Sequence, residues 1–314
     1  MTIEKKYDLI TYGTLGAGDF ANFGLGTVTG LGGRQTAALN DSGTAIQLMV
    51  TGSIASLNWT GALSSEWSTA TLAAPKNWLN GVVQDDFILG DNVTFDNSAT
   101  SFNVNIAGAN VTPTSTTFNN TTAYTLGSTG GFGIATGTLT KSGTGNLTIT
   151  TANNTYSGAT TIQNGRIIVG VDNALPTGTS LILGNNATGA SATHGTLDLT
   201  NFSQTIGGLT VLGDSTTVTA ADTILIGAGK TLTVNGNVSI GQTAGATAPK
   251  LTATGGGAMV VNGATFQIGA NTSNSTSVGS NSTVDFSGLS SFEATLSGNF
   301  NIGDVSTGNA GKAS

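Results

Sequence analysis

Cysteine is absent from this chain of 314 residues, proline occurs only 4 times and histidine once. Without thiols and with a single histidine, a zinc site or a Cys–His catalytic pair cannot form. Apart from the adjacent Lys5 and Lys6, the 9 basic residues are scattered singly in a chain of net charge −7, so the sequence predicts no basic patch for nucleic acid. The lack of cysteine is compatible with an exported chain, although many cytosolic proteins also lack it.

Long apolar runs and helical periodicity are missing as well. No run of about eighteen apolar residues occurs, so the sequence predicts no transmembrane helix and no membrane insertion by this segment. No stretch of helical length has apolar residues recurring at every third and fourth position. Hydrophobic residues still make up 38% of the chain, too many for a disordered protein. Thr, Asn, Ser and 47 Gly fill the remaining positions, which favours strands and tight corners and predicts an all-β fold.

The stretch 139–170 shows the pattern most clearly. Short alternating bursts, such as Leu147–Ile149 and Ile167–Val169, predict half-buried strands. Turn clusters end each burst, at 142–145, at 157–158 and at the Asn-Gly pair 164–165. A unit of this kind buries a single stripe, so we expect it to need a similar unit above and below it.

The same stretch resembles a known family, the autotransporter-associated β-strand repeat of bacterial surface proteins. The residues that carry the resemblance are Lys141, Gly143, Gly145, Leu147, Asn154, Tyr156, Gly158, Thr161, Ile162, Gly165 and Ile167. The resemblance implies a right-handed parallel β-helix in a secreted passenger region, located outside the cell or on the outer-membrane surface. It also implies a link to export efficiency. It specifies architecture well and molecular activity poorly.

The chain divides into three predicted parts. We expect residues 1–55 to be the end of a preceding β-repeat unit, either coils of a solenoid or a small sandwich. Residues 56–135 hold all three tryptophans and predict a cap or a lateral β subdomain, because the first coil of a solenoid otherwise exposes an apolar end. Residues 136–314 predict a parallel β-helix array.

Three segments of the predicted array are alike, beginning at Thr161, Leu232 and Met259. The Asn-Gly pairs of the last two lie 27 residues apart, 235–236 and 262–263, a period typical of stacked coils. Asn-Gly between alternating runs is also the strongest short hairpin signal, so antiparallel hairpins or a β-sandwich remain the alternative. Short strands, dense glycine and 6% aromatic residues favour the parallel helix, an interpretation that also rests on the family resemblance.

Candidate catalytic and metal-binding residues are few. Asp198, Asp222 and Asp285 are isolated, whereas glycan hydrolysis needs two neighbouring carboxyl groups. The cluster Asp85, Asp86, Asp91 and Asp96 has turn-like contexts and no calcium-loop spacing, so we expect turn formers. We expect His194 to lie in a surface turn, the tryptophans to be core anchors, and the Gly-rich segments to be corners without a phosphate-binding lysine.

The sequence therefore predicts a non-catalytic structural or adhesin-like segment of a secreted or surface-displayed protein, without cofactor or metal. Expected partners are surface glycans or a host or neighbouring cell surface, and open coil ends favour end-to-end self-association. The alternative is a β-helix that binds or cleaves polysaccharide. The N-terminus lacks the apolar core of a signal peptide, so we expect signal and anchor to lie outside this sequence.

Overall fold

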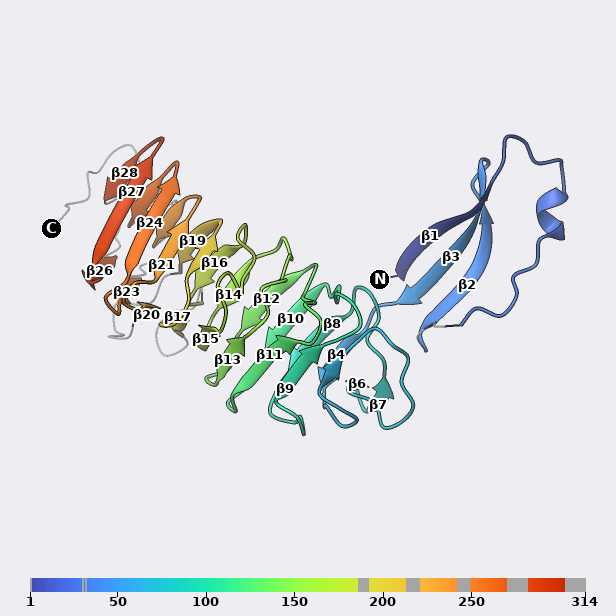
Figure 1. Ribbon diagram of the computed structural model, residues 1–314, viewed down its shortest axis with the longest axis horizontal. Helices are drawn as coiled ribbons and strands as arrows, with labels where there is room; N and C mark the ends of the chain where they lie inside the picture. The colour runs from blue at the N-terminus through green and yellow to red at the C-terminus, as the bar shows by residue number, and fades with distance from the viewer. Residues whose placement is uncertain are drawn as a thin grey trace.

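A computed structural model describes residues 2–29, 31, 33–185, 192–212, 221–241, 249–269 and 282–302. These residues form strands and, as their only helix, the short 3-10 helix η1, Asp19–Asn22. Figure 1 shows two parts: a long stack of strands and a small sheet that projects from its N-terminal end. In the part of the chain described here, no helix has the length and hydropathy needed to cross a membrane.

Three parallel sheets form the walls of the stack. The strands of the first sheet that follow the first coil are β8 Asn92–Phe95, β10 Ser115–Phe118, β12 Thr138–Lys141, β14 Thr160–Ile162, β16 Ser180–Leu183, β19 Gly208–Val211, β22 Val238–Ile240, β25 Phe266–Ile268 and β28 Phe300–Ile302. Every adjacent pair in this run is parallel.

The second sheet contains β5 Glu66–Trp67, β9 Asn103–Ile106, β11 Tyr124–Ser128, β13 Asn146–Ile149, β15 Gly165–Val169, β17 Gly195–Leu199, β20 Asp222–Ile226, β23 Lys250–Thr254 and β26 Thr283–Gly288. The third contains β18 Gln204–Ile206, β21 Thr231–Val234, β24 Ala258–Gly263 and β27 Ser291–Leu296. From β8 to β15 the chain alternates between the first two sheets, and from β16 on it visits all three in turn. Each strand pairs with the strand one coil away. The predicted parallel β-helix is therefore confirmed.

The core consists of side chains stacked in files along the helix axis. Alternate residues of each strand point inward, so one wall contributes the file Tyr124, Leu147, Ile167, Leu197, Ile224 and Ala253. All six are buried. Burying a side chain of the size of Leu or Ile contributes about 1.5–3 kcal/mol, so each coil supplies its own share of the stability.

The coil length changes along the stack. Leu139 pairs with Thr160 and Thr160 with Leu181, a step of 21 residues, whereas the step from Leu181 to Leu209 is 28. The two predicted Asn-Gly pairs 27 residues apart do stack coil on coil, because Val234 pairs with Val261. These strands are parallel, so the hairpin alternative is wrong here. The Asn-Gly pair 164–165 lies at a different corner, between β14 and β15.

Three tryptophans fill the N-terminal end of the core. Strand β4 (Ser56–Trp59) pairs parallel with β8 and antiparallel with β6 (Trp78–Asn80), which pairs in turn with β7 (Val83–Asp85). Trp59, Trp67 and Trp78 are buried, and Trp78 packs edge-to-face on the other two with ring centroids 5.0 and 5.6 Å away. They act as core anchors, as predicted from their size.

The core is continuous across the boundary expected near residue 135. One cluster of buried side chains extends from Leu57 to Phe266. Regular coils already begin with β8 and β9, so residues 92–128 belong to the same stack as the residues after 136. The sequence predicted a separate subdomain before residue 136 because the tryptophans lie there. Strand pairing does not change at this position, so the structure shows one continuous stack instead.

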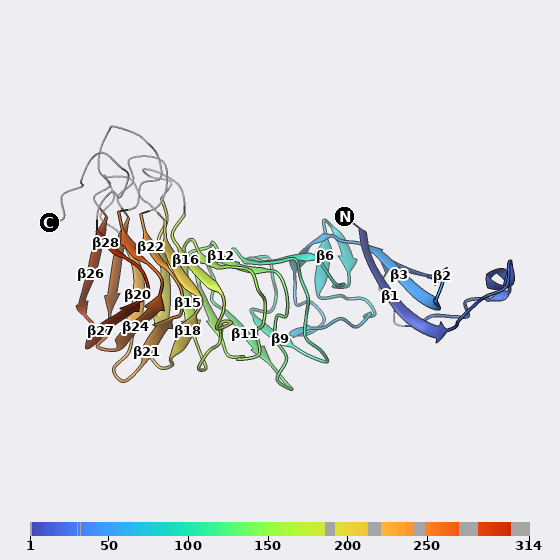
Figure 2. The ribbon, with the colours of Figure 1, turned by 90° about the horizontal axis from the view of Figure 1, so that it is seen from above.

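The first part of the chain is a single antiparallel sheet. Strands β1 (Thr2–Thr11), β2 (Gln35–Asp41) and β3 (Ala45–Ser53) pair in the order β1-β3-β2. The expectation of coils or a small sandwich for residues 1–55 does not match this topology. The strands alternate as expected, but they pair with one another and join none of the three parallel sheets, so they project beyond the stack (Figure 2).

Arg34 joins the projecting sheet to the first coil. Its guanidinium donates two hydrogen bonds to the carboxylate of Asp91, at 2.9 and 2.6 Å, and one to Asp85 at 2.7 Å. Asp91 is fully buried and also accepts hydrogen bonds from the backbone N–H groups of Ala55 and Ile88. A paired guanidinium–carboxylate fork of this kind fixes orientation as well as distance.

We expect Arg34→Ala to loosen the first coil, because it leaves the buried Asp91 without its counterion. Breaking such a pair costs about 3 kcal/mol or more. Hydrogen exchange of the Ala55 and Ile88 amides, which donate to Asp91, should accelerate at least tenfold. The exposed pair Lys6–Glu4 provides the control, since Lys6→Ala should change stability by less than about 1 kcal/mol. Equal exchange rates in both variants would contradict the role given to Arg34.

Candidate functional site

The residues singled out by the sequence meet in two successive coils, formed by β12 to β15. Leu147, Ile162 and Ile167 point into the core and are buried. Thr161 lies on the outward face of β14, half-buried, between Thr140 and Ile182 of the neighbouring coils. The glycines occupy corners, and Asn154 and Tyr156 lie in the segment between β13 and β14. The structure thus brings the predicted set together as parts of one coil-to-coil interface.

Two corner glycines show why this interface excludes side chains. A Cβ on Gly143 would lie 2.2 Å from the backbone N and O of Asn120 in the coil below. Gly165 has a φ of 69°, and a Cβ there would lie 2.5 Å from the carbonyl oxygen of Gly143. The obstructing atoms are backbone atoms, which cannot rotate away. Gly145 and Gly158 approach backbone oxygens one coil away in the same manner.

Asn154 connects three coils through one buried amide. Its Oδ1 accepts a hydrogen bond from the N–H of Ile134, at 2.8 Å, in the coil below. Its Nδ2 donates to the carbonyl of Thr151 at 3.2 Å and to that of Ala174, at 2.8 Å, in the coil above. Only asparagine and glutamine carry a neutral amide, which combines an acceptor oxygen with two N–H donors. The residue therefore satisfies backbone groups where no strand pairing does.

Tyr156 starts a second buried polar chain. Its hydroxyl and that of Thr160 lie 2.7 Å apart, and Thr160 lies 3.1 Å from the hydroxyl of Thr179 in the next coil. Thr179 donates to the carbonyl of Gly158 at 2.9 Å. Burial raises the pKa of Tyr156 well above its usual range, so the phenol stays protonated and can donate. The hydroxyls are paired inside the core, as buried polar groups need to be.

Among the lysines that the structure describes, Lys141 alone is completely buried. It occupies an inward position of β12, in the file between Phe118 and Ile162. Its ammonium group donates a hydrogen bond to the carbonyl of Gly143 at the corner. Burial lowers the pKa of Lys141 to about 8, because the charged form loses its hydration.

The comparisons with known proteins agree with this geometry. Residues 139–169 match the family model of the passenger-associated-transport-repeat. This segment is a passenger-associated transport repeat. The match covers the two coils in which the predicted residues meet, and it assigns to this segment a role associated with autotransporter passengers, proteins that reach the cell surface or the medium. None of the curated proteins and none of the solved structures compared matches the chain.

Outside the transport repeat, the predicted acidic cluster forms ion pairs rather than solvated turns. Asp91 and Asp85 bind Arg34, and the buried Asp86 binds Lys76. Asp96 and Asp91 also act in turns: Asp96 accepts a hydrogen bond from the N–H of Ser98 at 2.8 Å, and Asp91 accepts one from the N–H of Ile88 at 2.9 Å. Sequence reasoning missed both cations. The available signal was their rarity: Arg34 is one of two arginines in the chain.

The isolated carboxylates also acquire partners. Asp198 lies 3.0 Å from Arg166 of the coil below. Asp222 is buried, accepts a hydrogen bond from the N–H of Gly195 at 2.7 Å, and lies 3.8 Å from His194. The His194 side chain is only 15% exposed, so the expected surface turn histidine is in fact packed beside a carboxylate.

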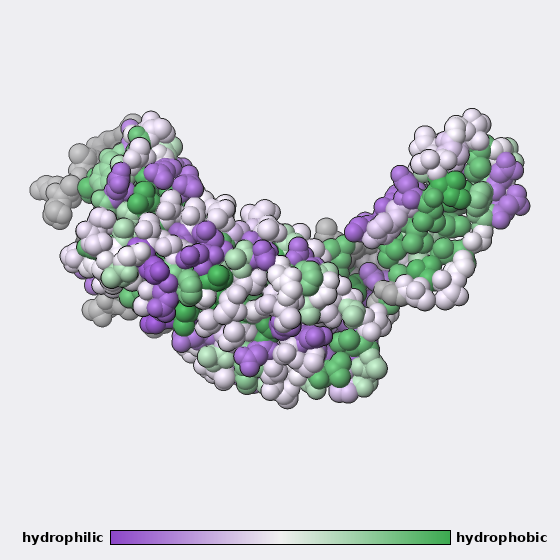
Figure 3. Space-filling view, in the orientation of Figure 1, coloured by the Kyte–Doolittle hydropathy of each residue, from purple (hydrophilic) through white to green (hydrophobic). Residues whose placement is uncertain are grey.

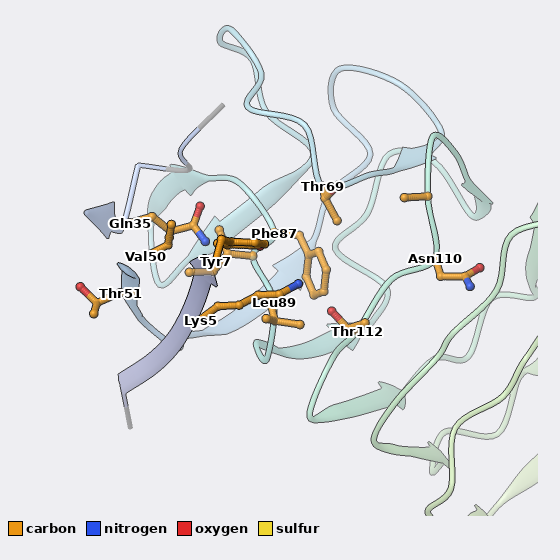
Figure 4. Close-up of a pocket in the computed structure, with 13 residues that line it drawn as sticks. Lys5, Tyr7, Gln35, Val50, Thr51, Thr69, Phe87, Leu89, Asn110 and Thr112 are labelled. Atoms are coloured by element: carbon orange, nitrogen blue, oxygen red, sulfur yellow. The ribbon is translucent and has the colours of Figure 1, made fainter. Parts of the chain in front are cut away.

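The side chains that a polysaccharide site would use are dispersed or buried in the described part of the chain. Within them, no three His, Asp or Glu side chains are grouped closely enough to hold a metal ion. A cavity of 380 Å³ lies between the projecting sheet and the first coil (Figure 4), and none of its 13 lining residues is Asp or Glu. The three tryptophans are buried, so they form no stacking platform for sugars.

We expect Asn154→Ala to destabilise the transport repeat by roughly 2–4 kcal/mol, because it removes the side-chain partner of three buried backbone groups. The neighbouring Asn153 supplies a matched control: it bonds the carbonyl of Gly131 from an exposed position, so Asn153→Ala should cost less than about 1 kcal/mol. Chemical denaturation of both variants measures the difference. Equal losses would show that the bridge across three coils is not what stabilises the segment.

Lys141 predicts a rise of stability with pH. Below about pH 8 both folded and unfolded chains carry its proton, and the folded chain bears the burial penalty. Between about 8 and the ordinary value of 10.5 the unfolded chain binds more protons, so the free energy of unfolding increases with pH. The full effect is on the order of 3 kcal/mol.

Lys141→Met should remove this rise and raise the stability at pH 7, since it replaces a buried charge by an apolar side chain. Denaturation midpoints at pH 7 and pH 9.5 measure it. Lys250→Met, on an outward and partly exposed position of β23, should keep the wild-type dependence. A Lys141→Met variant whose stability follows pH as the wild type does would refute the assignment.

Proposed function

We propose that this chain is a non-catalytic structural segment of an exported, surface-displayed passenger, and that its transport repeat assists folding during export. One observation supports the proposal above all. Of the repeat residues, Leu147, Ile162, Ile167, Lys141, Asn154 and Tyr156 are buried, and the glycines fill corners against the next coil. In such a motif most side chains contact the neighbouring coils, and few remain free to bind a ligand.

The mechanism follows from nearest-neighbour stacking. A newly formed coil finds its backbone partners on the coil before it, so folding advances one coil at a time. Asn154 bonds Ile134 behind it and Ala174 ahead of it, which links the ordering of three successive coils. For a chain that emerges progressively from a membrane, each completed coil opposes backward movement. Surface glycans or a neighbouring cell surface are the proposed partners of the displayed stack.

The proposal is tested by removing single coils from the complete gene in its own host. Deletion of residues 139–159 brings Thr160 into the position of Leu139 and shortens the stack by one coil of the repeat. Deletion of residues 116–138 brings Leu139 into the position of Thr116 and removes the coil before it. We expect the first deletion to slow surface appearance several-fold, with synthesis unchanged.

The second deletion should leave the rate of surface appearance within about twofold of the wild type. Pulse-chase labelling combined with protease accessibility of the surface-exposed chain measures both rates. If the two deletions slow export equally, the effect belongs to stack length and the transport repeat has no special role. If neither changes the rate, the folding-assisted mechanism is wrong.

A further inference from the structure

On one face of the projecting sheet, polar side chains form hydrogen bonds with one another. Gln47 donates to Asp8 at 2.8 Å and accepts from Asn40 at 2.9 Å, which ties all three strands together across this face. Thr36 and Thr51 form a further hydroxyl pair at 2.8 Å. Because these groups bond one another, this face has little need of a partner.

The opposite face is apolar and open. Residues that pair directly across antiparallel strands share a face, so the register places Tyr7, Leu48 and Leu39 in one row. The next rows contain Val50 with Ala37, and Ile46 with Ile10. Figure 3 shows this apolar surface on the projecting part of the molecule. Tyr7 is 45% exposed and Ile10 48%, values unlike those of the buried files in the stack.

The stack covers only the base of this face. Phe87, Ile88 and Leu89 of the first coil line the cavity of 380 Å³ together with Tyr7 and Val50 of the sheet, among others (Figure 4). Beyond this cavity Ile10 is exposed, Leu39 and Leu48 are half-buried, and Ile46 is buried. Three strands with an apolar face are stable when that face is covered, so the uncovered part calls for a partner.

Two charges of opposite sign mark the two ends of this face. Lys5 shares the row of Val50 at the base, and its ammonium group lies 5.1 Å from the centre of the Tyr7 ring. Asp41 shares the row of Ile46 at the far end. The hydroxyl of Tyr12 and the N–H of Gly43 donate to Asp41 and lower its pKa, which keeps the carboxylate ionised. Lys5 lies on the edge strand β1 and Asp41 on the opposite edge strand β2, so the two charges occupy diagonal corners of the face. A two-fold axis that passes through Leu48, at right angles to this diagonal, brings each Lys5 to the Asp41 of the other copy.

We propose that this face is a homodimer interface, in which the apolar faces of two copies pack together around a two-fold axis and Lys5 of each copy meets Asp41 of the other. A chain of net charge −7 repels its own copies over most of its surface, so the attraction has to come from this face. Two-fold packing of one patch on itself is the commonest mode of self-assembly. It differs from association through coil ends.

The dimensions indicate a weak dimer. Three strands of 7 to 10 residues present a face of about 400 Å² in projection, given strand spacings near 4.8 Å and a rise near 3.3 Å. This is below the area of a standard stable interface, so we expect a dissociation constant in the micromolar range or weaker.

Sedimentation velocity of the chain from about 5 to 500 μM tests the proposal. We expect a monomer–dimer equilibrium that Tyr7→Glu weakens at least tenfold. Lys6→Glu, the matched variant one residue away on the polar face, should change it less than threefold. A monomer at all concentrations, or equal weakening by the two variants, would overturn the proposal.

Charge exchange supplies the sharper test. Lys5→Glu and Asp41→Lys should each abolish self-association, whereas an equimolar mixture of the two variants should form a heterodimer, since every pair is again opposite in charge. If Asp41→Lys disturbs the turn at Gly43, Asp41→Asn keeps both hydrogen bonds and should weaken dimerisation several-fold. A mixture that associates no better than its components contradicts the two-fold arrangement.

A last variant separates this face from the open end of the last described coil. Phe300 is 50% exposed there and stacks on Phe266 with ring centroids 5.1 Å apart. Phe300→Ser should leave the dimer of the projecting sheets intact within threefold. If it abolishes association while Tyr7→Glu does not, the coil ends are the contact and the inference is wrong.

Discussion

Close contact between the backbones of successive coils is the constraint on which the rest of this structure depends. The strands are parallel and in register, so each coil follows the path of the one below it and meets it again at every corner. At Gly143 and Gly165 the neighbouring backbone leaves no space for a Cβ. A chain built in this way needs glycine at corners and small polar residues on its flat walls, and it has little use for long charged side chains. The unusual composition is a consequence of the packing.

The buried polar residues serve a purpose that apolar files cannot. A file of Leu and Ile side chains packs almost as well when a coil is displaced, because its members are similar. Asn154 has specific partners in the coils on either side, Ile134 and Ala174, and these contacts exist at one alignment only. Burying an amide costs stability unless its polar atoms are paired in this way. Polar groups of this kind exchange stability for a defined register, and register matters most in a fold of near-identical layers.

The sequence predicts local features of this chain well and distant partners poorly. Strands and corners between 139 and 170 follow from alternation and glycine, which act over a few residues. The pairing of Arg34 with Asp91, 57 residues away, has no local signature in the sequence. For this reason Asp91, which the sequence predicted to lie in a turn, is found in a buried ion pair. The same reason applies to β1 to β3: their alternation predicts strands, but the direction of pairing depends on which strand reaches which. His194 likewise lies beside Asp222, a residue of the next coil that no local pattern connects with it.

The extent of the transport repeat has a structural explanation. Residues 139–169 are longer than the 21 residues of the coil step at this place, so the segment contains two successive layers and the interface between them. Leu147 and its partner Ile167 both lie inside it, as do Gly165 and the Gly143 carbonyl that it approaches. The stability of such a stack is approximately the sum of the interaction energies between neighbouring coils. The smallest segment that contains one whole interaction is therefore an interface between two coils. A sequence motif selected for stacking therefore has to span about a coil and a half, whereas the flanking coils need only similar spacing and composition.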